Sequence, residues 1–106
     1  MPLYLDEIWL KWSDTQSARR TLGVFRDINS ASFPFPEGVR LVAGPWLSNE
    51  EAKIILILDI QDHSKTFPAF GLTLVHGVIA HRRLTPIVEW SAVQTLIDAL
   101  PPDPER

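Results

Sequence analysis

Hydrophobic residues are densest between Lys53 and Asp59, where five apolar residues stand in a row from Ile54 to Leu58. All five are Ile or Leu, and a charged residue stands on each side of the run. A strand with one face in water alternates apolar and polar residues, which this stretch does not do. We therefore predict a strand from Lys53 to Ile60 that is buried on both of its faces.

Three other segments have the composition of strands, namely Leu3 to Trp12, Val39 to Leu47 and His81 to Glu89. The last two contain Pro45 and Pro86, and proline has no N–H to donate to a sheet. We therefore expect the second and fourth strands to lie at the edges of the sheet.

Alternation in the first strand separates its side chains into two sets. The set assigned to the core is Ile8, Leu10 and Trp12, and the set on the opposite, mixed face is Glu7, Trp9 and Lys11.

The segments between the strands carry helical signals. Ser13 to Gln16 matches a capping box, so a helix should follow as far as Asn29, with Ala18, Leu22, Phe25 and Ile28 forming its apolar stripe. The segment 30–38 contains two prolines and a glycine, which predicts a loop attached to the body by its two phenylalanines.

Two more helices are expected further along the chain. One begins near Thr66 and ends near Gly77. A short C-terminal helix starts at a second capping box, Ser91 to Gln94, and presents Trp90, Val93, Ile97 and Leu100 on one side. The prolines at 101 and 102 end it, and we expect residues 101–106 to form a frayed tail.

The order of these elements is β-α-β-β-α-β followed by a helix, which predicts an α+β domain of ferredoxin-like topology. Right-handed crossovers place the first and third strands in the centre, so the strand order becomes 4-1-3-2. The length of 106 residues suits a single domain, 1–106. Two helices cover only one face of the sheet, and the apolar residues on the other face favour a two-fold homodimer.

Several short segments resemble the dimeric α/β-barrel superfamily, and within it a bacterial family of unknown function. The segments are the strand ending at Trp12, Pro36 to Leu41, Gly44 to Trp46, Ile55 to Asp59 and Leu84 to Val88. The resemblance covers most of residues 3–90 and implies a dimeric barrel. That superfamily includes cofactor-independent monooxygenases, isomerases, haem proteins, stress proteins and regulatory ligand-binding domains, so the fold alone does not fix the function.

Composition narrows the classes further. The chain has no cysteine, which excludes disulfides, thiolate nucleophiles and cysteine metal sites. A net charge of -3 gives no support for nucleic-acid or membrane binding. The N-terminus lacks the basic region of a signal peptide, and we expect a cytoplasmic protein.

Four residues are candidates for chemistry. Glu7 could act as an acid or base if its face of the sheet is enclosed, whereas a Glu7–Lys11 or Glu7–Arg ion pair at the dimer seam is the structural alternative. Trp9 and Trp46 could line an apolar ligand cavity, or could simply pack at the interface. A haem-binding relative would need an axial ligand, and His76 is the one candidate for it.

The remaining histidines give weaker signals. Asp62-His63-Ser64 has the residue types of a catalytic triad, but a turn that starts a helix explains these neighbours better. His76 and His81 are five residues apart, a spacing that does not suit two metal ligands on one helix. We expect no metal and no cofactor.

The leading hypothesis is a small homodimer that binds a small, largely apolar molecule beside the sheet. One alternative is an enzyme of the cofactor-independent monooxygenase or isomerase type, with Glu7 as acid or base and Trp9 and Trp46 as walls. A second alternative is a module whose only role is dimerisation.

Overall fold

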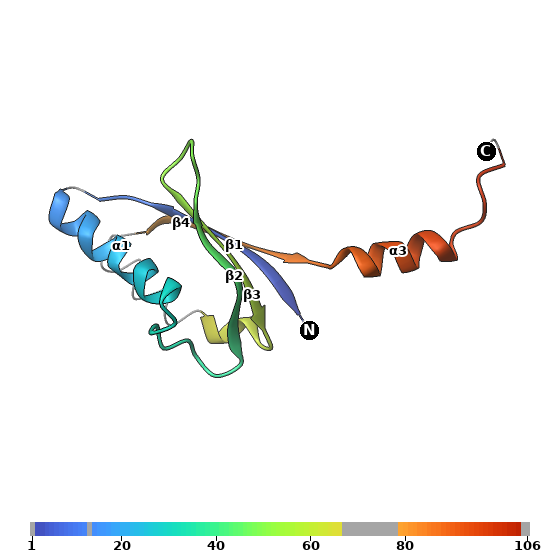
Figure 1. Cartoon of the computed structure of the whole chain (residues 1–106), viewed down its shortest axis with the longest axis horizontal. Helices are drawn as coiled ribbons and strands as arrows, with labels where there is room; N and C mark the ends of the chain where they lie inside the picture. Colours follow the sequence, from blue (N-terminus) through green and yellow to red (C-terminus); the bar gives the residue numbers. More distant parts are fainter. Residues whose placement is uncertain (1, 13, 67–78, 105–106) are drawn as a thin grey trace.

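The fold is known from a computed structural model, which describes residues 2–12, 14–66 and 79–104 (Figure 1). Its elements are β1 (Leu3–Leu10), α1 (Thr15–Asn29), β2 (Val39–Leu47), β3 (Lys53–Ile60), the 3₁₀ helix His63–Thr66, β4 (Ile79–Ile87) and α3 (Trp90–Ala99).

The four strands form one antiparallel sheet in the order β2-β3-β1-β4. This is the predicted order 4-1-3-2 read from the other edge, and the chain is an α+β protein. The two strands that contain Pro45 and Pro86 lie at the edges, as predicted. The helix expected from Thr66 to Gly77 falls almost wholly on residues 67–78, which lie outside the described part, so the structure does not test the full ferredoxin-like topology.

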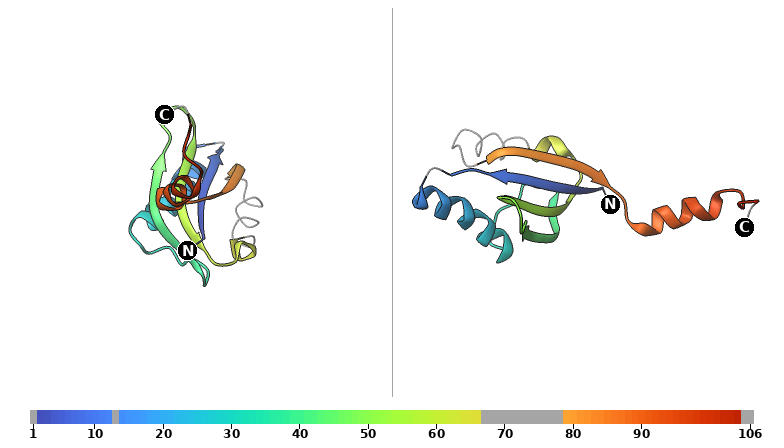
Figure 2. Two further views of the ribbon diagram at one scale, coloured as in Figure 1. Left: turned by 90° about the vertical axis from the view of Figure 1, so that its right-hand side faces the viewer. Right: turned by 90° about the horizontal axis from the view of Figure 1, so that it is seen from above.

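The two faces of the sheet differ in burial. Helix α1 lies against one face (Figure 2), where Ile54, Leu56 and Leu58 of β3 are almost completely buried. On the other face Ile55 and Ile57 are only half-buried. One chain by itself therefore buries the apolar run of β3 fully on one face only.

The sheet face turned away from α1 is called the open face below. Strand alternation and register assign to it Leu5, Glu7 and Trp9 of β1, Lys53, Ile55 and Ile57 of β3, Trp46 of β2, and His81 and Arg83 of β4.

Helix α1 is capped one residue later than the sequence predicted. The cap is Asp14, whose Oδ1 accepts a hydrogen bond of 2.7 Å from the backbone N–H of Ser17. The Ser17 hydroxyl in turn accepts from the Asp14 N–H, which completes a capping box. The predicted box at Ser13 and Gln16 was therefore misplaced by one residue, since Asp14 and Ser17 have the same spacing and also suit a capping box. The helix ends at Asn29, as predicted.

The buried side of α1 consists of Thr21, Phe25 and Ile28. Leu22, which the sequence placed in the apolar stripe, is exposed. Thr21 can be buried because its hydroxyl donates to the Ser17 carbonyl oxygen and so needs no water. After the helix, Phe33 packs edge-on against the ring of Phe35, and both rings pack against the core. This confirms the predicted attachment of the loop by its two phenylalanines.

Three strand boundaries differ from the predicted ones, and one of them is the end of β4, which lies at Ile87 and not at Glu89. β1 ends at Leu10, and Trp12 lies beyond it, exposed rather than in the core. β4 begins at Ile79, two residues before the predicted start, because the Ile79 side chain belongs to the core. An irregularity opposite Trp9 and Leu10 separates Ile79 from the regular pairing of the rest of β4.

Helix α3 projects from the end of β4, away from the sheet (Figures 1 and 2). None of its residues is buried. The predicted capping box at Ser91 is wrong, because Ser91 lies inside the helix and Glu89 occupies the cap position without a side-chain hydrogen bond. The helices within the described residues all fall short of the length and apolarity that a membrane span requires.

The cap of α1 predicts a specific sensitivity to acid. Its hydrogen bonds from Ser17 lower the pKa of Asp14 below the ordinary value of 3.8. The contribution of the Asp14 cap to the unfolding free energy is therefore complete above pH 3.8 and is lost as the pH falls through the lowered pKa. Asn also caps helices well but does not titrate. We expect the difference in unfolding free energy between wild type and Asp14→Asn to shift in favour of the variant below about pH 4, measured by urea unfolding from pH 2 to 7. Parallel pH curves would contradict this role.

Replacing either of two glycines, Gly44 and Gly23, by alanine should change the unfolding free energy, and the two changes should have opposite signs. Gly44 has φ +95°, and a Cβ there would lie 2.7 Å from the carbonyl oxygen of Ile55. Gly44→Ala should lower the unfolding free energy by about 1–3 kcal/mol. Gly23 lies inside α1, where a Cβ would only contact the Arg26 side chain at 3.8 Å. Gly23→Ala should raise stability by roughly 0.5–1 kcal/mol. Urea unfolding measures both, and a neutral Gly44→Ala would show that β2 can shift away from β3.

Candidate functional site

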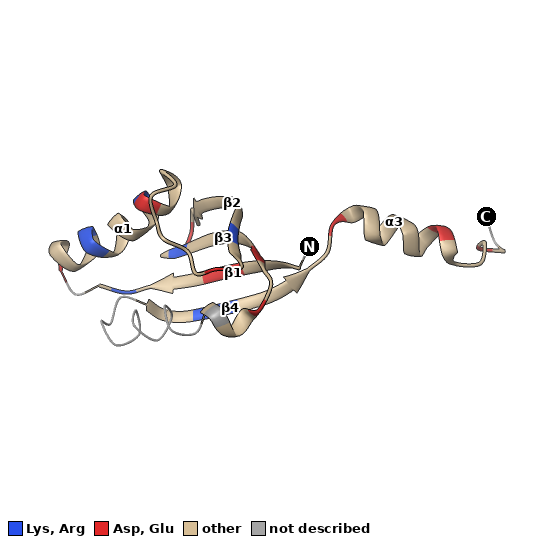
Figure 3. Cartoon of the chain, turned by 90° about the horizontal axis from the view of Figure 1, so that it is seen from below, with Lys and Arg blue, Asp and Glu red and all other residues tan. Residues whose placement is uncertain are grey.

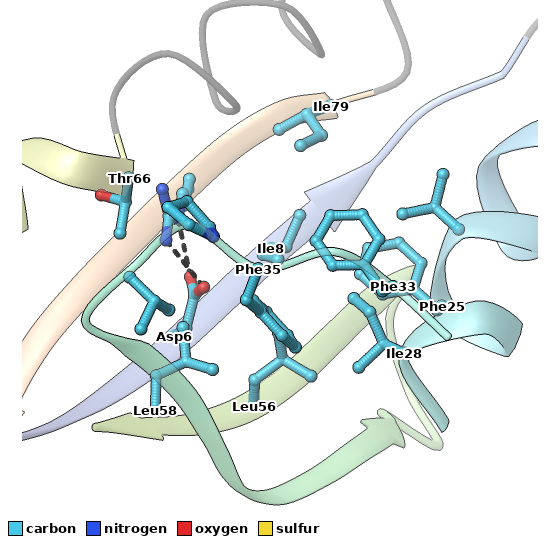
Figure 4. A pocket seen from close by; sticks show the side chains of 14 residues that line it. Asp6, Ile8, Phe25, Ile28, Phe33, Phe35, Leu56, Leu58, Thr66 and Ile79 are labelled. Atoms are coloured by element: carbon cyan, nitrogen blue, oxygen red, sulfur yellow. Dashed lines mark hydrogen bonds and ion pairs between the residues drawn. The ribbon is translucent and has the colours of Figure 1, made fainter. Parts of the chain in front are cut away.

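A cavity of about 100 Å³ lies between the sheet, helix α1 and the loop that follows α1 (Figure 4). The sheet contributes residues from all four strands, α1 contributes Phe25 and Ile28, and the loop contributes Phe33 and Phe35. The phenylalanines come from two different segments and surround the aliphatic side chains of the sheet. Most of the described lining is therefore apolar, as is typical of small-molecule pockets.

The described lining contains three polar residues, Asp6, Thr66 and Arg82. Asp6 and Arg82 form a two-pronged ion pair, in which Nε and Nη2 of Arg82 donate to the two carboxylate oxygens of Asp6, each at 2.8 Å. Asp6 is 2% exposed and the Arg82 side chain 13%. The pair is therefore a strong, nearly dry interaction, and Figure 4 shows it at one end of the cavity.

The register of the sheet explains how this pair forms. β1 and β4 are neighbours, and Asp6 lies opposite Leu84 while Arg82 lies opposite Ile8. Asp6 and Arg82 are thus diagonal neighbours on the face that α1 covers, within reach of a long arginine side chain. The pair connects a central strand to an edge strand through side chains.

The sequence contains a signal for this pair in the alternation of β1. Asp6 has the same parity as Ile8 and Leu10, which were assigned to the core. A carboxylate on a core-facing parity needs a buried partner, and arginine is the residue best suited to pair with it in two-pronged geometry. Arg82 could have been found as the partner only once the register between β1 and β4 was known.

A second polar cluster lies on the open face. The Lys53 ammonium donates to Glu7 Oε2 at 3.1 Å and lies 3.5 Å from Glu51 Oε2. It also lies 5.0 Å from the centre of the Trp9 ring, which in turn packs 5.0 Å from the ring of His81. The hydrogen bond to Glu7 is the main cause that raises the pKa of Lys53 above 10.5, despite the opposing effect of desolvation.

Three of the four predicted site residues lie in the described part of the chain, apart from the cavity. Glu7, Trp9 and Trp46 are on the open face, and none of them is among the described residues that line the cavity. Glu7 forms an ion pair, as the structural alternative proposed, but its partner is Lys53 and not Lys11 or an arginine. Ligand binding by Trp9 and Trp46 stays a prediction. His76 lies outside the described residues.

The Asp62-His63-Ser64 segment has the local role expected of a turn. Asp62 Oδ1 accepts hydrogen bonds from both the N–H and the hydroxyl of Ser64 at the start of the 3₁₀ helix. The His63 ring packs edge-on against Tyr4. Within the described ranges, no group of three or more histidine, aspartate or glutamate residues could hold a metal ion.

Comparison with known proteins gives no relative. No protein-family model, no curated protein and no solved structure matches this chain.

The buried ion pair predicts strong coupling between its two members. Asp6→Leu or Arg82→Met alone should lower the unfolding free energy by about 3–5 kcal/mol, because each removes one half of a two-pronged ion pair in a nearly dry site. The double variant should recover most of this loss, since it removes both charges. Urea unfolding of the four proteins gives the coupling energy.

The matched control is the exposed pair Arg26–Asp27, which is 3.4 Å apart at the surface. Asp27→Asn should change stability by less than about 0.5 kcal/mol. If Asp6→Leu were equally mild, the ion pair would have no special role in the fold.

Proposed function

We propose that this chain is a homodimeric small-molecule-binding protein of the ferredoxin-like, dimeric α/β-barrel type. Its ligand is a small, largely apolar molecule held in the cavity between α1 and the sheet. The observation that carries the proposal is the cavity itself, which combines an apolar wall with one dry ion pair, Asp6–Arg82.

The chemistry of the lining supports this class of ligand. Aromatic and aliphatic side chains favour an apolar body, and the few polar groups of such a site fix its orientation. The described lining supplies polar groups from three residues, and the Asp6–Arg82 pair is the charged one. A ligand with a single polar substituent could place it beside that pair while its apolar part contacts Phe25 and Phe35.

The size of the cavity restricts the ligand further. At about 100 Å³ it is smaller than the roughly 300–1,000 Å³ typical of drug-sized ligands. Engineered apolar cavities of about 150 Å³ bind benzene or xenon. The proposed ligand is therefore a molecule of few heavy atoms, unless the loop that carries Phe33 and Phe35 moves outward.

Homodimerisation is supported by the half-buried apolar residues of the open face. Ile55 and Ile57 belong to a continuous apolar run, and only one of its faces is fully covered within the chain. Apolar surface of this kind is normally an association site in a folded protein. The enzyme alternative stays a prediction, with Glu7 held by Lys53 on the side of the sheet away from the cavity.

Ligand binding is tested with benzene and xenon as probes, followed by NMR of isoleucine and leucine methyl groups. We expect saturable shifts at Ile8, Leu56 and Leu58, which line the cavity. Val24→Phe places extra atoms in the cavity from α1 and should weaken benzene binding at least about tenfold, because the space is then filled.

The matched control is Leu22→Phe, which adds a ring at an exposed position of the same helix. It should leave benzene binding unchanged within about twofold. Equal binding by both variants, or shifts located on the open face, would place the ligand site elsewhere and reject the proposal.

A further inference from the structure

The large apolar side chains that are exposed in the described residues fall into two main groups. On β2 the exposed residues are Val42, Trp46 and Leu47, but Leu47 pairs with Ile54 and so points to the face that α1 covers. The β2 patch is therefore defined as Val42 and Trp46. The other group lies on the C-terminal arm, defined as residues 88–100, and consists of Val88, Trp90, Leu96, Ile97 and Leu100. Trp90 is 67% exposed and Trp46 is 50% exposed, so each group leaves a large ring in water.

The arm has the pattern of a helix made to pack against another surface. Trp90, Val93 and Ile97 follow one another at spacings of three and four, which places them on one side of α3. Ser91, Gln94, Thr95 and Asp98 occupy the other side, where the Gln94 amide donates to Asp98 and the Thr95 hydroxyl to the Ser91 carbonyl. An amphipathic helix with no buried residue lacks the packing that normally stabilises it.

The two groups lie at opposite ends of the sheet. Trp9 pairs with Lys53 at the end where β2 and β3 are joined, and Leu3 pairs with Ile87 at the end where the arm leaves. The six residue steps from Leu3 to Trp9 span about 20 Å. The arm then leads further away from the sheet (Figure 1), so it points away from the β2 patch of its own chain.

The surface area supports a second copy as the occupant. A folded monomer of 12.0 kDa is expected to expose about 6,000 Å². This chain exposes 7707 Å², an excess of about 1,700 Å² over that expectation. Obligate homodimers bury roughly 1,000–2,500 Å² on each copy, which matches the excess.

The overall dimensions also show that the chain is more extended than a compact domain of its length. The radius of gyration is 17.4 Å, against about 13 Å for a compact domain of this length. The longest axis measures 61 Å and the next 32 Å, because the arm extends the molecule in one direction. The chain therefore has the shape of a compact body with an appendage.

We propose that the apolar side of α3 docks on the β2 patch of a second copy of this chain, and that the second copy returns the same contact. This inference rests on the homodimer proposed above and adds the exchanged arm to it. A two-fold axis makes such an exchange reciprocal, so each arm and each β2 patch is covered in one closed pair. Helix α3 contains no Lys or Arg (Figure 3), and the side with Trp90, Val93 and Ile97 is apolar.

The first test measures the dimer by light scattering and sedimentation over a range of concentrations. Ile97→Asp puts a charge on the docking side and should raise the dimer dissociation constant at least about tenfold. Ser91→Asp adds the same charge on the other side of α3, in its first turn, and should leave the constant within about twofold. Ser91 and Ile97 are both exposed in the single chain, so neither change disturbs its core. Circular dichroism checks that each variant keeps its fold.

The second test locates the contact through disulfides, since the natural chain has no cysteine. The double variant Trp46→Cys/Ile97→Cys should form covalent dimers on mild oxidation. The control Trp46→Cys/Ser91→Cys should form at least about fivefold fewer, because Ser91 is on the far side of the helix.

The outcomes separate this inference from the proposed function. If Ile97→Asp dimerises as tightly as wild type, the arm exchange is overturned while the open-face dimer stands. If the wild type is a monomer and Trp46→Cys/Ile97→Cys closes only within one chain, both the exchange and the dimer are overturned. Ligand binding in the cavity is tested independently and depends on neither result.

Discussion

The structure depends on how the apolar side chains of β3 are covered. Ile54, Leu56 and Leu58 are buried under α1, and they form the centre of the core together with Ile8 and Phe25. The neighbouring residues Ile55 and Ile57 point to the opposite side of the same strand and are only half-buried. A chain of this size has enough helix to cover one face of its sheet, and the other face is the one that the proposed homodimer would cover.

This asymmetry assigns different chemistry to the two faces. The covered face holds the apolar cavity, and the Asp6–Arg82 pair is almost inaccessible to water there. The open face carries the cluster of Glu7, Lys53 and Trp9, in which the ammonium group lies between two carboxylates and an aromatic ring. A ligand site that must be shielded from water would therefore lie on the covered face, and a contact surface for another molecule would lie on the open face.

The sequence was a good guide to the sheet because its strongest patterns come from strands. The apolar run of β3 and the prolines in β2 and β4 were enough to place the central and edge strands correctly. The helix cap was misplaced by one residue, since Ser13 and Asp14 are both cap-forming residue types and only Asp14 takes the position. The cavity could not be predicted, because it depends on how Phe33 and Phe35 pack against the core and on a register that makes Asp6 and Arg82 diagonal neighbours.

The irregular edges of the sheet have a consequence for assembly. Along β2 the pairing with β3 shifts on both sides of Ala43, next to Gly44 and Pro45. β4 has an irregularity near its start and Pro86 near its end. A strand from another molecule would find an interrupted row of hydrogen-bonding groups at either edge, which discourages open-ended, amyloid-like strand addition. The chain can thus leave apolar side chains of its open face exposed while the edges of its sheet resist growth into a fibre.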